Sequence, residues 1–371
     1  MDTAASWLEI GERIAEARRA ADMSQGELAT RIGLDRTAMV RIEAGERRVS
    51  ALELARLGEE LGVPMAHFVS RPPAPLASQR RGLDETTDSA SRSHYRLDVL
   101  LETHARNAQW LVEQGFLVPP APSVDVPRST TGVDVGEVTK LARNAREAMG
   151  APSGPLGALA SVVEEFGLYV TVADEDAEGA SLLLEGFGVA IISGRSEPGR
   201  RRWTAAHELG HHLLHDAYNS DVGVAAGRDG REQLVDRFAG EFLLPDNDLL
   251  STWRRMSGAD QSPRDVLLGL ATDYRLSWSA VVARARQAAL VNVADARRLR
   301  ANTPVRGDFL AIRGSEPSPD LTIGETGAQW RRAVLSAWHQ GAITGARTVE
   351  LLYGAVTVDD LPARNIADCL P

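Results

Sequence analysis

The chain has 371 residues, 43% hydrophobic and 25% charged, which is enough apolar material for more than one hydrophobic core. Its formal net charge of -10 excludes a surface that binds nucleic acid indiscriminately, so any DNA contact is expected on one local element. The single cysteine, Cys369, excludes an internal disulfide framework, and no run approaches the roughly 18 apolar residues of a membrane span, so we expect a cytoplasmic protein without a membrane partner.

The N-terminal region predicts five short helices between residues 8 and 69. Two Ser-x-x-Glu capping boxes, which begin at Ser24 and Ser50, are expected to open two of them. Asp35 is expected to cap a third helix in between. The pattern therefore predicts a small helical domain over residues 1–70.

The stretch MSQGELATRIGLDRTAMVRIEAGERRVS resembles the helix-turn-helix of XRE/Cro-type repressors, and the resemblance covers about 60 residues. It implies that a short helix enters the major groove of double-stranded operator DNA. We expect a homodimer that reads half-sites about one helical turn apart. The side chains expected at the base edges are Gln25, Arg36, Thr37, Val40 and Arg41, with Arg47 and Arg48 near phosphates.

An alternative for this domain is a helical module that binds protein and has lost DNA binding. Residues 1–70 hold nine arginines against three aspartates and nine glutamates, so the domain is not basic overall. The arginines do cluster between Arg36 and Arg48, which favours DNA.

Beyond residue 70 the composition changes. Residues 71–132 are expected to be a linker that contains one long helix, from about residue 95 to 118. Two helices are then expected, over 135–149 and 156–166, followed by three strands, LYVTV, SLLLE and GVAIIS. The strand GVAIIS is expected to present an edge to a substrate peptide. The predicted fold class is mainly α with a small β-sheet (α+β).

The stretch RRWTAAHELGHHLLH has a helical pattern and contains an H-E-x-x-H motif. His207 and His211 lie one helical turn apart, so both imidazoles project to the same side and can share a tetrahedral metal ion. Glu208 lies about 100° around the helix from His207, which suits a base that takes a proton from water better than a ligand. The alternative is that both histidines are ordinary surface residues of an amphipathic helix.

A third ligand is expected from the next helix, predicted over residues 232–244. Glu232 is our choice of ligand, and Asp236, one turn later, is expected to accept a hydrogen bond from a liganding histidine. Glu241 is expected to be a surface carboxylate, and the alternative for Glu232, Asp236 and Glu241 is that all three only form ion pairs. His212 and His215 are expected to face solvent or to support the ligands, and His215 and Tyr218 are candidates to stabilise an oxyanion.

Together, RRWTAAHELGHHLLH and EQLVDRFAGEFLLP resemble the ImmA/IrrE family of zinc-dependent metallopeptidases. The resemblance covers about residues 133–290, and we assign residues 133–292 to a zincin-like peptidase domain. It implies Glu232 as the third zinc ligand and a substrate that is a specific DNA-binding repressor or an antitoxin-like protein, under stress or mobile-element control. Many members carry asparagine where this chain has Asp236, which leaves the role of Asp236 open.

The sequence is therefore interpreted as a DNA-binding regulator fused to a zinc endopeptidase. Residues 293–371 are expected to form a loop-rich join and two or three short helices, as a small helical C-terminal region. A site with two nitrogen ligands and one oxygen ligand also admits Mn²⁺. The alternative function is a transcription factor or toxin-antitoxin component that cleaves nothing and whose metal site is structural or sensory.

Overall fold

The structure, a computed structural model, describes residues 6–70, 89–121, 124, 134–175, 179–215, 225–257 and 261–364. These residues belong to two compact units, of which the first ends at Asn107 and the second begins at Ala108. The fold is mainly helical with one small sheet, as the sequence predicts. Among the described helices, none combines the length and hydropathy that a membrane crossing requires.

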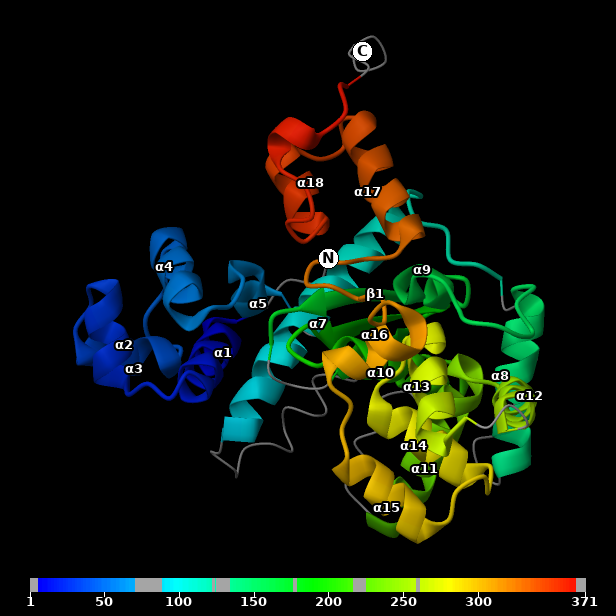
Figure 1. Cartoon of the computed structure of the whole chain (residues 1–371). Coiled ribbons are helices and arrows are strands. Elements are labelled where there is room, and N and C mark those ends of the chain that lie inside the picture. Colours follow the sequence, from blue (N-terminus) through cyan, green and yellow to red (C-terminus); the bar gives the residue numbers. More distant parts are fainter. Residues whose placement is uncertain are drawn as a thin grey trace. The chain divides into compact units, whose positions relative to one another are not determined.

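The first unit contains the five predicted short helices, which Figure 1 labels from α1 to α5. Their bounds are α1 (Trp7–Ala20), α2 (Gln25–Ile32), α3 (Arg36–Glu43), α4 (Ala51–Leu61) and α5 (Met65–Val69). The longer helix α7 (Ser89–Glu113) follows them. The core of this unit is formed by fully buried apolar residues, among them Ile14, Leu28, Met39, Ile42 and Phe68.

Both predicted capping boxes are present. The hydroxyls of Ser24 and Ser50 accept the backbone N–H of the glutamate three residues later, which in turn accepts the serine N–H. Each such cap is worth about 1 kcal/mol of helix stability. Gly45 follows α3 with φ of 71°, and a Cβ there would lie 2.7 Å from Cα of Leu8. Only glycine therefore satisfies both the backbone conformation and the packing at this position.

The part of α7 that belongs to the first unit packs on the short helices through polar side chains. His67 of α5 is fully buried, and its Nδ1 lies 3.0 Å from Oε2 of Glu102, which is also fully buried. Nε2 of His67 lies 2.9 Å from the hydroxyl of Tyr95. Buried polar groups must be paired in this way to avoid a desolvation cost of roughly 1–3 kcal/mol each. The contacts therefore fix the position of α7 on this unit.

The sheet of the second unit has the strand order β1-β3-β2, with β1 (Leu168–Ala173), β2 (Gly179–Leu184) and β3 (Phe187–Ser193). β1 is parallel to β3, and β2 is antiparallel to it. The expectation that GVAIIS forms an edge was wrong, because this segment is β3, which pairs on both sides. All seven residues of β3 are buried, which is typical of a central strand.

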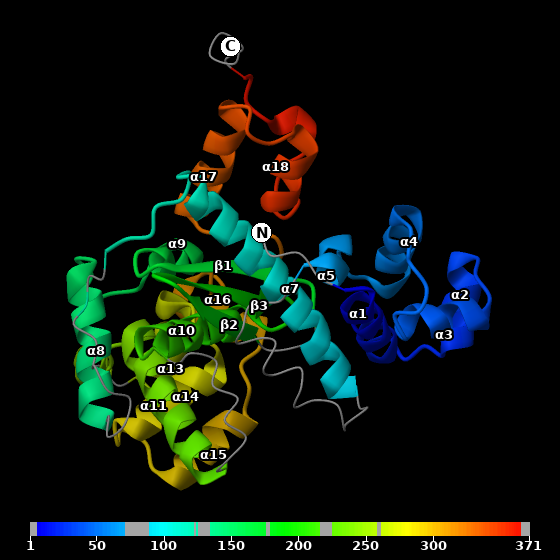
Figure 2. The ribbon, with the colours of Figure 1, turned by 180° about the vertical axis from the view of Figure 1, so that it is seen from behind.

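Several helices of the second unit lie before and after this sheet in the chain. They are α8 (Val135–Ala148), α9 (Leu159–Glu164), α10 (Pro198–Leu213), α11 (Ala225–Leu243), α12 (Asp246–Ser257), α13 (Pro263–Tyr274) and α14 (Trp278–Gln287). α10 packs against all three strands, and α11 packs against α10 and α8. Figures 1 and 2 both show the sheet, then α10, then α11 as successive layers.

Residues after α14 carry more helix than the sequence suggests. The segment expected as a loop-rich join forms α15 (Val293–Ala301) and α16 (Arg306–Arg313), so that expectation was wrong. Phe309 and Ile312 of α16 pack against the core of this unit, but no residue of α16 is fully buried. The expected short helices around Trp330 and Leu351 are present as α17 (Ala328–His339) and α18 (Gly345–Leu351), followed by a turn of 3₁₀-helix, Val358–Asp360.

The start of α17 is capped by a carboxylate from another helix. Glu164 of α9 accepts the backbone N–H groups of Gln329 and Trp330, at 2.7 and 2.9 Å. Gly327 permits this approach, because any Cβ there would clash with the carboxyl group of Glu164. Burial raises the pKa of Glu164 to about 7, although both hydrogen bonds act in the opposite direction.

Candidate metal centre and DNA-reading face

The helix α10 carries the H-E-x-x-H motif and lies between the sheet and α11. Pro198 begins it in the first turn, where the missing N–H has no cost. Ala205, Ala206 and Leu209 are fully buried between the sheet and α11. This apolar stripe fixes the rotation of α10 about its axis, and with it the direction of the two histidines.

Gly210, inside the motif, controls how closely α11 approaches α10. A Cβ at this position would lie 3.0 Å from Cγ1 of Val235 and 3.1 Å from Cδ1 of Phe238, both on α11. A helix-interior glycine costs about 1 kcal/mol relative to alanine. The close approach that it permits brings Glu232, on the same helix α11, to the histidines of α10.

The three predicted ligands lie together. Nε2 of His207 is 3.1 Å from Nε2 of His211 and 3.1 Å from Oε2 of Glu232, and the remaining pair, His211 and Glu232, is separated by 3.8 Å. Zinc with bonds of about 2.0–2.1 Å in a tetrahedral site separates its ligand atoms by about 3.3 Å. The donor set therefore fits a tetrahedral ion with little movement, and the half-exposed carboxylate of Glu232 leaves one side of the site accessible.

The electrostatics of this cluster also suit a cation. Burial lowers the pKa of His207, but hydrogen bonds with Asp236 and Glu232 outweigh it and raise that pKa to about 10. Hydrogen bonds with the two histidines hold the pKa of Glu232 well below its ordinary value. The site thus attracts positive charge, which a divalent ion supplies in place of a proton.

Asp236 of α11 lies beside His207. Its Oδ1 is 3.1 Å from Nδ1 of His207, the ring nitrogen that does not face the other two ligands. The same oxygen accepts a hydrogen bond from the indole N–H of Trp203, at 3.2 Å. Trp203 was not singled out from the sequence, although it lies one helical turn before His207 and so on the same side of α10.

Glu208, which follows His207 on α10, is hydrogen-bonded to the sheet. Its Oε2 accepts a hydrogen bond from the hydroxyl of Ser181 on β2, at 2.5 Å. Both residues are more than nine-tenths buried, and Glu208 is not one of the clustered ligands. The second oxygen, Oε1, is 3.5 Å from the position that a Cβ at Gly179 would occupy, so the small residues of β2 make room for the carboxylate.

The two remaining histidines of this segment differ from each other, since His215 is exposed as expected and His212 is held against the sheet. His212 lies 2.9 Å, through Nε2, from the backbone carbonyl of Phe166, and its ring packs on Gly188 of β3. Burial lowers its pKa to about 4, so His212 anchors α10 to the sheet as a neutral ring rather than facing solvent. His215 is exposed after the end of α10 with φ of 49°. Tyr218, the other oxyanion candidate, lies outside the described residues.

Glu241 was expected at the surface, and this was wrong. It is fully buried, with Arg143 at 2.8 Å and Arg284 at 3.0 Å. Arg284 also donates to the carbonyl of Leu244, so this network ties the C-terminal end of α11 to α14. The partners are 98 and 43 residues away in the chain, and no local pattern indicates them.

The predicted DNA-reading residues share one face of α3. Arg36, Thr37, Val40 and Arg41 are exposed, whereas Met39 and Ile42 on the opposite side are fully buried. This separation leaves the four side chains available for a partner. Of the expected phosphate contacts, Arg48 is exposed and Arg47 forms an ion pair of 2.7 Å with Glu53.

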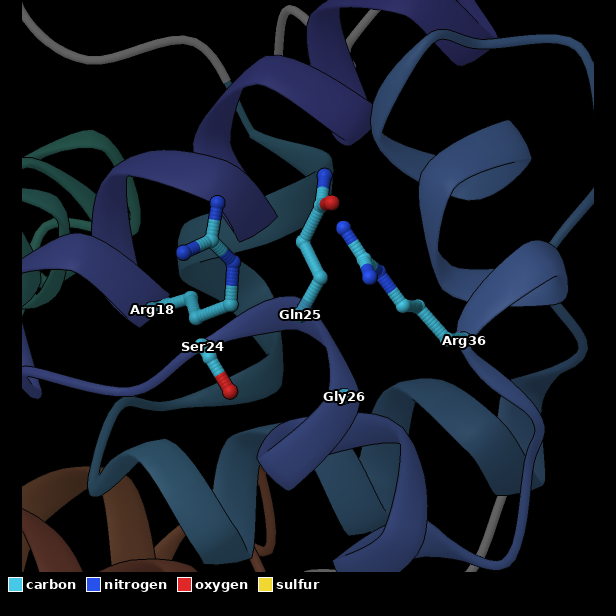
Figure 3. A pocket seen from close by; sticks show the side chains of 5 residues that line it. All are labelled: Arg18, Ser24, Gln25, Gly26 and Arg36. Atoms are coloured by element: carbon cyan, nitrogen blue, oxygen red, sulfur yellow. The ribbon is translucent and has the colours of Figure 1, made fainter.

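The side chain of Gln25 is hydrogen-bonded to Glu43 of the same unit. Its amide donates to Oε2 of Glu43 at 2.7 Å, and Glu43 also binds Arg18 through both oxygens, at 2.6 and 3.0 Å. Figure 3 shows Gln25 and Arg36 directed toward each other from the starts of α2 and α3. They line a pocket of about 550 Å³ with Arg18, Ser24 and Gly26. Arg18, which the sequence analysis did not name, thus adds a second arginine to this pocket.

Comparison with known families matches both parts of the chain. Residues 14–68 match the family model of the helix-turn-helix, which covers the second half of α1 and continues into α5. Residues 163–286 match a peptidase family model described as the IrrE N-terminal-like domain. This second match contains the sheet and the helices α10 and α11. No curated protein matches the chain.

Proposed function

Because the chain joins a helix-turn-helix domain to an IrrE-like domain of a peptidase family, we propose that it is a DNA-binding regulator with a zinc-dependent endopeptidase activity. The observation that carries the proposal is the convergence of His207, His211 and Glu232, from two helices, at ligand-to-ligand distances of 3.1–3.8 Å. We propose these three residues as the ligands of Zn²⁺, with Mn²⁺ as a second ion that such a site admits.

In the proposed mechanism, bound zinc supplies a Lewis acid that polarises a peptide carbonyl and makes water acidic near pH 7. Glu208 takes a proton from the attacking water and then delivers it to the nitrogen of the leaving amine. Ser181 keeps one oxygen of Glu208 in a hydrogen bond, so that the carboxylate has one defined orientation. Asp236 accepts a hydrogen bond from the Nδ1–H of His207, which keeps the proton on Nδ1 and leaves Nε2 free to bind the metal.

The substrate is proposed to be a protein segment that pairs with β2 as an added strand. Among the described strands, β2 pairs with β3 on one side only, and the hydrogen bond from Ser181 places β2 directly beside Glu208. Backbone hydrogen bonds at a strand edge give affinity for an extended peptide with little demand on its sequence. We propose that the substrate is a specific helix-turn-helix repressor or antitoxin-like protein, in stress or mobile-element control.

The N-terminal domain is proposed to bind operator DNA as a homodimer, in the cytoplasm. The exposed face of α3, with Arg36, Thr37, Val40 and Arg41, and the neighbouring Gln25 support this role. Arginine can contact guanine through two hydrogen bonds in the major groove. The proposed domain ranges are residues 1–70 for DNA binding, 71–132 for the linker, 133–292 for the peptidase and 293–371 for the C-terminal region.

The replacement Glu208→Gln tests the endopeptidase. The wild-type and variant chains are expressed separately in cells that lack the native gene, and new protein N-termini are identified by mass spectrometry. We expect wild-type cells alone to contain one or a few new N-termini, while both purified proteins hold about one zinc per chain.

The competing proposal is a transcription factor or toxin-antitoxin component whose metal site is structural or sensory. It predicts the same set of N-termini in both cultures, together with unchanged gene regulation in the variant. Degradation of casein by the wild-type chain would instead indicate unspecific proteolysis.

A further inference from the structure

Trp203 occupies a defined place next to the proposed metal site. It lies on α10 one turn before His207, and its indole N–H reaches Oδ1 of Asp236 on α11 at 3.2 Å. That oxygen also accepts the Nδ1–H of His207 at 3.1 Å. One carboxylate oxygen thus receives two donors that are neighbours on the surface of α10.

We propose that Trp203 is a positioning residue that holds Asp236 in place for His207, and so strengthens metal binding. The proposal rests on the function proposed above for His207, His211 and Glu232. The side chain of Asp236 is 50% exposed, so water competes for its oxygens, and a single hydrogen bond from His207 leaves the carboxylate free to rotate. A second donor from a less mobile ring removes much of this freedom.

The indole itself is held firmly enough to do this. Its ring packs against the core of the second unit and lies along one turn of α11, from Asp236 to Gly240. A Cβ at Gly240 would lie 3.3 Å from the Cη2 atom of Trp203 and 2.7 Å from Cδ of Arg284. Gly240 therefore makes room for the ring. α11 contacts the indole at both ends, through the hydrogen bond to Asp236 and through the packing at Gly240.

The hydrogen-bonding groups of Trp203 and Asp236 are also complementary. Indole has a single N–H and can only donate, whereas an ionised carboxylate can only accept. Asp236 can accept both hydrogen bonds on one oxygen and still keep its charge beside the imidazole of His207.

The test is the zinc affinity of the full chain, measured by competition with a chromophoric chelator. The variants are Trp203→Phe, Asp236→Ala and the double variant. Loss of a residue that orients a liganding histidine weakens metal binding roughly 10–100-fold, which we expect for Asp236→Ala. For Trp203→Phe we expect about 3–10-fold, as one of two donors to Asp236 is lost. The double variant should bind as weakly as Asp236→Ala and no weaker.

Trp278→Phe is the matched control. Trp278 is also largely buried, and its indole N–H donates to the carbonyl of Leu299 at 2.8 Å, so its replacement removes the same ring and the same type of hydrogen bond. We expect unchanged zinc affinity. Thermal unfolding of each metal-free protein separates a loss of stability from a loss of metal affinity.

The proposal is overturned if Trp203→Phe binds zinc like the wild type, or if its effect multiplies with that of Asp236→Ala. A wild-type chain that binds no zinc would instead remove the proposed metal site itself. If Trp203→Phe does not fold, the indole ¹H–¹⁵N signals of the wild type are compared with those of Asp236→Ala. Asp236→Ala should shift one of them and speed its exchange with solvent, and a spectrum without such a change would also overturn the proposal.

Discussion

The hydroxyl of Ser181 donates a hydrogen bond of 2.5 Å to the carboxylate of Glu208, which connects the strand β2 to the motif helix α10. We expect Ser181→Ala to lower kcat of peptide cleavage about 5–20-fold, because a hydrogen bond to a charged group is worth roughly 1.5–3 kcal/mol and part of it is regained from water. Zinc content should stay at the wild-type level, since Ser181 contacts none of the three proposed ligands.

Ser193→Ala serves as the control for this prediction. Ser193 lies on β3 and donates to the carbonyl of Glu175, so its loss removes a strand serine without affecting Glu208. The measurement is the rate of cleavage of a substrate fragment at saturating concentration. Equal rates for Ser181→Ala and wild type would show that Glu208 needs no help from β2.

Gly210→Ala is expected to weaken zinc binding. The new methyl group would lie 3.0 Å from Cγ1 of Val235 and 3.1 Å from Cδ1 of Phe238. Both side chains are fully buried on α11, so we expect α11 to shift by a few tenths of an ångström and Glu232 to move away from the histidines. Overpacking of this kind costs roughly 1–3 kcal/mol, against a gain of about 1 kcal/mol in helix propensity. Calorimetric titration with zinc measures the loss.

Gly230→Ala is the matched replacement on α11. Gly230 is exposed, and a Cβ there meets no atom within 4 Å, so only the helix propensity changes. We expect a free energy of unfolding higher by up to about 1 kcal/mol and unchanged zinc affinity. Identical behaviour of the two variants would mean that the distance between α10 and α11 does not limit metal binding.

The stability of the second unit should depend on pH through Glu164. Burial raises the pKa of this carboxyl group from 4.5 to about 7, so the folded chain binds more protons than the unfolded chain between these values. Its contribution to stability is therefore complete below about pH 4.5 and is lost as pH rises through 7. The full effect is about 3 kcal/mol.

Urea unfolding of the wild type and of Glu164→Gln between pH 5 and 7.5 measures this dependence. We expect the free energy of unfolding of the wild type to fall with pH by up to about 1.4 kcal/mol per pH unit more than that of the variant. The comparison uses slopes, so a constant destabilisation of the variant does not affect it. Parallel slopes would show that Glu164 is ionised throughout the folded state in this range.

DNA binding should depend on the exposed arginines of α3. Full-length chain is used to enrich duplexes from a random-sequence pool, and the enriched duplexes are then titrated with variants. We expect Arg41→Ala to weaken binding roughly 5–150-fold, if Arg41 contacts a base, with relaxed preference at one position. Arg298→Ala, which removes an exposed arginine from α15 on the second unit, is expected to bind like the wild type. A wild-type chain that enriches no sequence would favour the protein-binding alternative for the N-terminal domain.

Local features of this protein follow from the sequence alone. The capping boxes at Ser24 and Ser50, the spacing of His207 and His211, and the resemblance to two families all depend on residues a few positions apart, and the family matches confirm both resemblances. Such signals are readable because a helix places residues three or four positions apart on one side, whatever surrounds it.

The tertiary structure decided those contacts between distant segments that no motif or family resemblance indicates. It placed GVAIIS in the centre of the sheet, buried Glu241 against Arg284, and brought Ser181 and Trp203 to the carboxylates of Glu208 and Asp236. Strand order and the pairing of buried charges are set by the packing of the whole unit, since many pairings satisfy the same local pattern and only one also fills the core and satisfies its buried polar groups.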